Sequence, residues 1–481
     1  MRVLAHAHAS GLRSNHELAW NIPTEENAIN DRETAVDRPV PNRRTFVKGS
    51  AAAAGAALLG TLEPGRYAHA AGSDVLKLGL IGCGGRGAGA ASDALSADPN
   101  TKLWAAADVF ADKIDEAVKQ LTGMFGDRVQ VDGARRFAGL DGYRGVIENC
   151  DVVLIACASR FHPKYALAAA QAKKPLFVEK PGAIDVAGIN QLLEAAALSE
   201  KNGSGLLAGL TYRYHLGRRE AIERIRNGEI GEIVAIQCDY LRTPYRLITR
   251  DPKWTEMQYQ LRNWYHFTWL SGDDVLQSLV HNFDSALWVL GDQPPLQAYG
   301  LGGRSTHFQV EMGTSFDHHA CVLEYADGKR VYGFGRTAVG CFGSNVDVFH
   351  GTKGRCIFQA FAPPRFTDLK GVETWKASAE LSKASPYKQE HVEFFRSLRE
   401  GRPFQDGKRM ATSTLTTMLG QVTAYNGKRV TWEELLASKF AFPPAGEVRM
   451  DMEPPVQLGK DGIYPVAIPG STKLWGATAG T

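Results

Sequence analysis

VLKLGLIGCGGRG, residues 75–87, is the stretch that decides the fold of this chain. Its first part, Val75 to Ile81, is a short apolar run rich in strand formers, and the alanine-rich residues 88–95 after the glycines predict a helix. A strand, a glycine-rich turn and a helix in this order are typical of a dinucleotide-binding unit. We therefore expect a dinucleotide cofactor to bind here.

The glycines of the turn are spaced as G-x-G-x-x-G, and each has its own physical reason. Gly82 permits the tight turn, Gly84 lets the backbone contact a pyrophosphate, and Gly87 permits close packing of helix on strand. The free N–H groups and partial positive charge at the helix N-terminus suit the phosphates. The predicted cofactor-binding residues of this loop are Gly82, Gly84, Gly85, Arg86 and Gly87.

An acidic residue follows the second predicted strand, Leu103 to Ala107. Asp108 stands there, 26 residues after Gly82. An acid at this place can accept both ribose hydroxyls of NAD and would repel the 2′-phosphate of NADP, so NAD is expected as the cofactor and NADP is less favoured. The alternative is an ordinary cap at the end of the strand.

A further strand, helix and strand follow at residues 151–156, 163–172 and 175–178. This spacing predicts a right-handed crossover, and ligands bind where parallel strands end. The last of these strands runs into Glu179-Lys180-Pro181. Lys180 is therefore expected to point at the cofactor crevice.

Composition limits the class of protein. The chain has 481 residues, which favours two or three domains, and its formal charge of +3 is too small to argue for a nucleic-acid partner. Its seven cysteines are widely spread, with no C-x-x-C pair. We expect no zinc knuckle, no disulfide framework and no metal site.

The first seventy residues resemble a targeting sequence. Residues 1–42 are polar and without apolar period, and we expect them to be disordered. Residues 43–70 begin with Arg43-Arg44, continue through a small apolar run and end in an A-x-A site, which resembles a Tat export signal. The apolar run, residues 49–62, is well short of the roughly 20 residues that span a bilayer. The alternative is a surface segment with a chance arginine pair.

The predicted signal implies a location and a partner. We expect passage through the Tat export machinery to the periplasm, or another exported location, without stable membrane insertion. Tat exports folded proteins, so the cofactor would be loaded before export.

The motifs together resemble the Gfo/Idh/MocA oxidoreductases, a family that includes glucose–fructose oxidoreductase and inositol dehydrogenase. The resemblance runs from about Lys77 to Lys439. Beyond GCGGRG it rests on ADVF (107–110), EKP (179–181), SGDDVLQSLVHNFDSALWVLG (271–291), GTKGR (351–355) and YKQEHVEFFRSLREGRPF near the C-terminus.

The resemblance implies an α/β fold of two domains. A Rossmann NAD(P)-binding domain is expected over residues 75–205, followed over 206–445 by an α/β domain with an open, mostly antiparallel sheet. Residues 446–481 are expected to be a C-terminal tail. We also expect a homo-oligomer.

The resemblance also assigns site residues. Lys180 and His281 would flank the reacting carbon, and Glu179 and Lys180 would join the cofactor-binding residues. The expected substrate-binding residues are His162, Arg213, Gln277 and Asp284. The alternative for His162 is a plain turn residue, and that for His281 is a histidine satisfied within a half-buried helix.

Gln277 departs from the family pattern, in which many relatives carry an acid four residues before the histidine. A glutamine can hold the imidazole by a hydrogen bond but cannot stabilise its cation as a carboxylate would. Asp273 and Asp274 are interpreted as N-terminal helix caps. Residues 254–269 are rich in aromatic side chains, which suit a sugar ring but are more often core or subunit contacts.

Three functions are compatible with this sequence. The first is an NAD-dependent oxidoreductase acting on a secondary alcohol of a small-molecule carbohydrate, a sugar or polyol, with tightly retained cofactor. The second is an NAD-dependent glycosidase that oxidises the ring transiently, eliminates the aglycone and returns the hydride. The third is a dinucleotide-binding protein without catalysis. The residues do not identify which sugar is bound.

Overall fold

The first sheet is built from short strands whose side chains are buried on both faces. The computed structural model describes residues 74–306 and 308–474, and within them this sheet has six parallel strands in the order β3-β2-β1-β4-β5-β6. The strands are β1 (Leu76–Ile81), β2 (Thr101–Asp108), β3 (Arg136–Ala138), β4 (Val152–Ile155), β5 (Leu176–Glu179) and β6 (Leu206–Gly209). This is the predicted Rossmann-type domain. The predictions for residues 1–42 and 43–70 fall outside the described residues.

Helices connect these parallel strands and cover the sheet, as a sheet buried on both faces requires. They are α1 (Gly85–Ala97), α2 (Ala111–Phe125), α3 (Gly142–Asn149), α4 (His162–Gln171) and α5 (Val186–Asn202). Helix α1 approaches β1 so closely that a Cβ at Gly87 would lie 1.8 Å from the carbonyl oxygen of Gly82. Gly82 has φ +95°, which favours glycine. Both positions therefore need glycine, in agreement with the sequence argument.

The end of the first domain differs from the predicted boundary at residue 205. Strand β6 pairs in parallel with β5, so the first sheet continues to Gly209. The reason is that Leu206–Gly209 is buried throughout, and its natural neighbour is the equally buried β5. The boundary lies one strand later than expected.

The second sheet is mostly antiparallel, as predicted. Within the described residues it has nine strands in the order β14-β13-β12-β11-β7-β10-β9-β8-β15, and β7 with β10 is its parallel pair. The strands are β7 (Ile233–Arg242), β8 (Gln297–Gly303), β9 (His318–Glu324), β10 (Arg330–Thr337), β11 (Ser344–Gly351), β12 (Gly354–Gln359), β13 (Arg365–Asp368), β14 (Glu373–Lys376) and β15 (Val430–Thr431).

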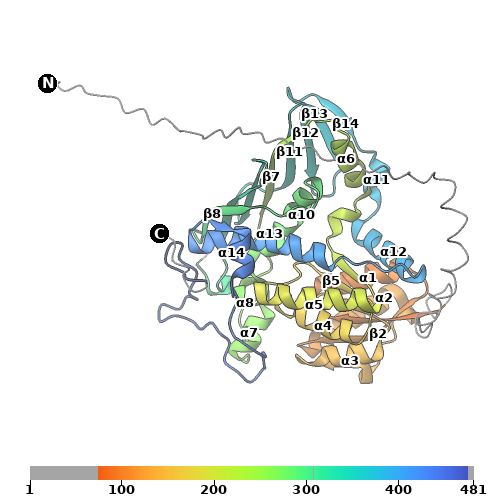
Figure 1. Cartoon of the computed structure of the whole chain (residues 1–481). Coiled ribbons are helices and arrows are strands. Elements are labelled where there is room, and N and C mark those ends of the chain that lie inside the picture. The colour runs from red at the N-terminus through yellow and green to blue at the C-terminus, as the bar shows by residue number, and fades with distance from the viewer. Residues whose placement is uncertain (1–73, 307, 475–481) are drawn as a thin grey trace, which may run out of the picture. The chain divides into compact units, whose positions relative to one another are not determined.

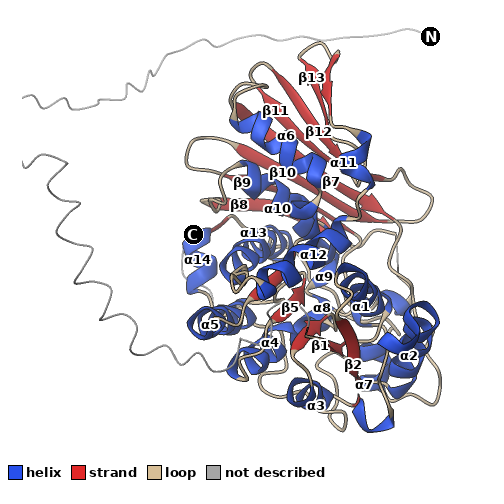
Figure 2. Cartoon of the chain, turned by 90° about the vertical axis from the view of Figure 1, so that its right-hand side faces the viewer, coloured by secondary structure: helices blue, strands red, loops and turns tan. Residues whose placement is uncertain are grey.

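Helices pack on one face of this second sheet (Figure 2). They are α6 (Leu216–Arg226), α10 (Val280–Val289) and α13 (Gly407–Asn426). Side chains alternate along the strands, so that Val331 and Gly333 of β10 are buried while Phe334 on the other face is 39% exposed. The second face is open, and it carries apolar side chains.

The predicted histidine helix over residues 271–291 is two helices. These are α9 (Asp273–Ser278) and α10, with Leu279 between them. The chain enters α9 through Gly272 and Asp273, whose φ angles are +72° and +75°. His281 thus lies in the first turn of α10, and Gln277 lies near the end of α9.

The chain after β7 contains five further helices, several of which are labelled in Figure 1. They are α7 (Glu256–Arg262), α8 (Thr268–Ser271), α11 (Ala379–Lys383), α12 (Pro386–Arg399) and α14 (Trp432–Ala437). Helix α12 packs on α1, and α13 packs on α5. No helix among the described residues is long and apolar enough to cross a membrane.

Residues 446–474 are packed against the body of the protein, whereas the sequence predicted a tail. The side chains of Val448 and Tyr464 are buried. The Tyr464 ring lies edge-on to Phe267, with centroids 4.9 Å apart, and its hydroxyl donates to Glu256. Apolar anchors spaced along an otherwise irregular segment explain why it is held without secondary structure.

Candidate active site

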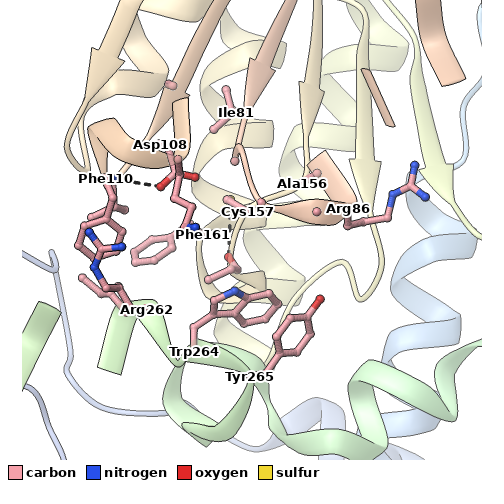
Figure 3. Close-up of a pocket in the computed structure, with 18 of the residues that line it drawn as sticks. Ile81, Arg86, Asp108, Phe110, Ala156, Cys157, Phe161, Arg262, Trp264 and Tyr265 are labelled. Atoms are coloured by element: carbon pink, nitrogen blue, oxygen red, sulfur yellow. Dashed lines mark hydrogen bonds between the residues drawn. The ribbon is translucent and has the colours of Figure 1, made fainter. Parts of the chain in front are cut away.

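A cavity of about 340 Å³ lies at the carboxyl ends of β1, β2 and β4 (Figure 3). The first domain contributes the glycine loop, Asp108 and an aromatic group to its wall. The lining residues from the first domain include Gly82, Gly84, Gly85, Arg86, Asp108, Phe110, Tyr143, Cys157, Phe161 and Tyr165. This is the edge at which ligands bind to parallel sheets.

The glycine loop leaves room for a phosphate group. A Cβ at Gly84 or Gly85 would meet nothing within 4 Å, in contrast to the blocked position at Gly87. Helix α1 begins at Gly85 with no side-chain cap and no acidic residue in its first turn. Its first N–H groups and its dipole are therefore available to an anion. The residues present fit the pyrophosphate of a dinucleotide.

Asp108 lies at the end of β2 and faces the cavity. Its carboxylate oxygens accept hydrogen bonds from the backbone N–H of Cys83 (2.8 Å) and of Phe110 (3.0 Å). Burial raises the pKa of Asp108, and the two N–H donors act against that shift. Each oxygen keeps a second lone pair, so the carboxylate can accept a ribose hydroxyl as well as cap the loop.

Lys180 lies close enough to His281 to lower the pKa of the imidazole. The Lys180 ammonium donates to the carbonyl of Gln277 at 2.8 Å, across the boundary between the domains. Burial lowers the pKa of His281 well below its usual range, and the positive charge of Lys180 lowers it further. The His281 ring lies 4.9 Å from the Tyr212 ring, and its buried Nδ1 has no hydrogen-bond partner among the described residues. Neither Lys180 nor His281 lines the cavity described above, and their catalytic roles stay predictions.

Comparisons with family models agree with this arrangement. The model described as an oxidoreductase family with an NAD-binding Rossmann fold matches residues 76–203, and that of the GFO/IDH/MocA C-terminal domain matches residues 219–357, together more than half of the chain. The chain belongs to the Gfo/Idh/MocA oxidoreductase family. A twin-arginine translocation signal matches residues 40–60, so the predicted Tat signal is confirmed, and export to the periplasm is consistent with it.

Several proteins similar to this chain are named as enzymes of polyols or sugars. Myo-inositol 2-dehydrogenase of Thermotoga maritima is 25% identical over 282 residues, which cover 58% of this chain and 74% of that protein. Two further curated relatives are covered over 57% and 55% of their length. Aldose-aldose oxidoreductase from Caulobacter crescentus, complexed with glycerol, has a TM-score of 0.58 at 18% identity, over 74% of this chain and 99% of that one. Levoglucosan dehydrogenase in complex with NADH and levoglucosan also has a TM-score of 0.58 at 18% identity, over 74% of this chain and 99% of that one.

Arg86 and Glu179 bind each other, whereas the sequence predicted that both contact the cofactor. Arg86 Nε lies 3.1 Å from Glu179 Oε1, and Arg86 Nη2 donates to Asp93 at 3.0 Å. Glu179 is buried, and its other oxygen accepts from the Lys180 backbone N–H at 3.1 Å. Arg86 still lines the cavity, but Glu179 does not. A buried carboxylate needs a cation, and Arg86 supplies it. The pair ties the glycine loop to the turn that carries Lys180.

The Gln277 side chain donates to two groups of the protein and does not bond to the His281 imidazole, and its expected substrate contact stays a prediction. Its side-chain N–H groups donate to Ser159 Oγ at 3.0 Å and to the Ser271 carbonyl at 2.5 Å. The break between α9 and α10 turns the side chain toward the loop after β4. The part of Gln277 that reaches the site is its backbone carbonyl, which accepts from Lys180.

Arg213 and Asp284 form a buried ion pair, whereas the resemblance predicted substrate contacts. Arg213 donates to Asp284 from Nε at 2.9 and 3.0 Å and from Nη2 at 2.8 Å. Ser413 donates to the same carboxylate at 2.7 Å, and Asp292 binds the guanidinium. Each charge is satisfied within the protein, as burial demands. Neither presents a free group to a ligand.

His162 is buried between two loops and makes contact with backbone groups. Its Nδ1 lies 2.8 Å from the Pro181 carbonyl, and its Nε2 lies 3.0 Å from the Cys157 carbonyl. Burial lowers its pKa to about 4. His162 therefore joins the turn after β5 to the loop after β4. These contacts fit the alternative of a turn residue, and the expected substrate contact of His162 stays a prediction.

The other wall of the cavity comes from the second domain, and the sequence reasoning did not assign it. Its lining residues are Arg246, Ile248, Trp254, Leu261, Arg262, Trp264 and Tyr265. In Figure 3, Trp264 and Tyr265 rise from this segment toward the strand ends. Trp264 and Tyr265 stack with centroids 3.8 Å apart. The aromatic-rich stretch 254–269 was the available signal, but core packing was the more common explanation for it.

Gln277→Glu should destabilise the protein and should not raise activity. The carboxylate cannot donate to the Ser271 carbonyl, so the change costs about 3 kcal/mol of unfolding free energy. Its pKa would be raised by burial, so the loss should be small at pH 5, where the acid is protonated and can donate, and larger at pH 8. Thermal unfolding at both pH values measures this.

Gln258→Glu is the matched control. Gln258 accepts from the Thr255 N–H in a capping box, which glutamate serves equally well. This variant should keep wild-type stability. A Gln277→Glu protein that is as stable as the wild type and more active would restore the view that a carboxylate here serves His281.

Proposed function

We propose that this protein is an NAD-dependent oxidoreductase that moves a hydride between the nicotinamide and a secondary alcohol of a sugar or polyol. The observation that carries the proposal is the glycine-loop cavity with Asp108 on its wall, together with Lys180 on the turn after β5, whose charge lowers the pKa of His281. The names of the relatives, which include a myo-inositol and a levoglucosan dehydrogenase, support a polyhydroxylated substrate. Asp108 supports NAD over NADP, because its carboxylate would repel a 2′-phosphate.

The proposed roles follow from the state of each side chain. Bound NAD supplies the hydride acceptor. His281 is neutral at physiological pH because burial and Lys180 lower its pKa, so it can take the hydroxyl proton of the substrate. The Lys180 ammonium, held by the Gln277 carbonyl, stabilises the negative charge that develops on the substrate oxygen.

Export through the Tat pathway supports a retained cofactor. The periplasm holds no pool of free NAD, so a cofactor that dissociated would be lost. The second-domain wall lines one side of the cavity, which supports slow release of a bound cofactor. A retained cofactor must be reoxidised in place, either by a second sugar or by return of the hydride to the same substrate. An NAD-dependent glycosidase returns the hydride to the same substrate, so the Tat signal also supports this alternative function.

Protein purified from the periplasm should release close to one equivalent of cofactor on denaturation. Mass spectrometry should identify it as NAD(H) and not NADP(H), and extensive dialysis should not remove it. A polyol that is a substrate should convert the bound NAD to NADH, up to one equivalent per protein molecule. Aglycone release without net reduction would favour the glycosidase, and no response to any sugar would favour a non-catalytic protein. An empty protein that needs millimolar NAD would contradict retention.

Lys180→Met and His281→Ala should each lower turnover on the order of 10²-fold or more while leaving cofactor content unchanged. The lowered pKa of His281 means that the wild-type kcat/KM should not fall between pH 8 and pH 6 through protonation of this residue. Stopped-flow reduction of the bound nicotinamide measures the step directly. Near-full activity of His281→Ala from pH 6 to pH 9 would rule out its proposed role.

We further propose that the open face of the second sheet is covered by a second copy of the chain. Leu301 and Phe334 flank Ala320 across three neighbouring strands, and they are 63% and 39% exposed. Light scattering should give a multiple of the monomer mass, and Phe334→Lys should shift the mass toward the monomer. Leu458→Lys, a position of equal exposure away from the sheet, should not. A monomeric wild type would exclude this role for the face.

A further inference from the structure

A segment of the second domain covers the end of the cavity where Asp108 lies. It consists of residues 243–266, which follow β7 and include α7, and we call it the cover. Arg246, Ile248 and Trp254 of the cover line the same cavity as Asp108 and the glycine loop. By the geometry of the Rossmann unit, the acid after the second strand marks the adenosine half of the dinucleotide. The cover therefore lies over the adenosine half.

Arg262, at the end of α7, fastens the cover to the first domain. Its two Nη atoms donate to the two carboxylate oxygens of Asp112 at 2.9 and 2.8 Å. Asp112 lies in the first turn of α2, four residues after Asp108. This bidentate pair joins the cover to the segment that carries the ribose-binding acid.

Aromatic rings hold the same guanidinium from both domains. The Arg262 guanidinium carbon lies 3.9 Å from the ring centroid of Phe110, two residues after Asp108, and 4.8 Å from that of Trp254 within the cover. Arg262 and Phe110 both line the cavity (Figure 3). The cover cannot lift without breaking the ion pair and removing Arg262 from Phe110.

Residues 442–464, which we call the C-terminal segment, also contact the cover. Gln260 of α7 donates to the Val456 carbonyl at 2.7 Å, and the Tyr464 hydroxyl donates to Glu256. The start of the segment is fixed to the first domain, because Arg160 donates to the Phe442 carbonyl at 3.1 Å and Asp185 accepts from the Phe442 N–H at 2.9 Å. The segment thus connects the cover to the first domain a second time.

We propose that Arg262 and Asp112 form a latch that closes the cover over the adenosine half of the bound dinucleotide and sets the rate at which the cofactor leaves. The inference rests on the proposed function, since it assumes that the cavity holds NAD(H). Neither residue needs to contact the reacting atoms. The latch acts on dissociation, which is where differences in affinity mostly lie.

The test measures cofactor release without any sugar. Holoenzyme loaded with NADH is diluted into excess NAD, and the loss of bound nicotinamide fluorescence gives the dissociation rate. Arg262→Met should raise this rate about tenfold, since it removes both the ion pair and the ring contact. Asp112→Asn should raise it about threefold, because it leaves Arg262 on Phe110.

Asp115→Asn is the matched control. Asp115 lies one turn further along α2 and pairs with Arg136 at 2.7 Å, away from the cavity. The Asp115→Asn variant should release NADH at the wild-type rate, and thermal unfolding should place all three variants near the wild type.

Equal NADH dissociation rates for the wild type, Arg262→Met and Asp112→Asn would overturn the latch. An Asp115→Asn variant that released NADH as fast as Asp112→Asn would overturn it as well. Fast NADH release by the wild type would contradict the proposed cofactor retention but not the latch, because the ratio of each variant's dissociation rate to that of the wild type would still test the latch. A protein that binds no NADH would overturn both the proposed function and the latch.

Discussion

The hydrogen bond from the Lys180 ammonium to the Gln277 carbonyl joins the turn after β5 in the first domain to helix α9 in the second. This hydrogen bond requires that the turn carrying Lys180 and the end of α9 carrying Gln277 are both held in place. On one side, the Arg86–Glu179 pair and the buried His162 hold the turn that carries Lys180. On the other side, the Gln277 side chain anchors the end of α9. His281 follows directly in α10, so the position of the proposed base is set by the same contact.

Local patterns predicted the first domain, whereas the form of the second domain was expected from the family resemblance. The apolar run before the glycines, the acid after the second strand and the lysine after β5 each follow from a strand that must end at the ligand edge of a parallel sheet. The strands of the second sheet alternate in burial, which a period of two in the sequence predicts. The helix that carries His281 was also predicted, although its break at Leu279 left no local signal.

Pairings between distant residues could not be predicted in the same way. Arg213 and Asp284 are 71 positions apart, and Arg262 and Asp112 are 150 apart. A charged residue near a site motif carries the same local signature whether it meets a ligand or a partner within the protein. The difference is decided by what the fold places opposite it, and a single sequence does not contain that information locally.

The anchoring of residues 442–464 on both domains has a consequence for biosynthesis. The strands and loops that bind the dinucleotide leave the ribosome long before these residues do. The contacts that hold α7 through residues 456 and 464 can therefore form only after the strands of both sheets have been synthesised.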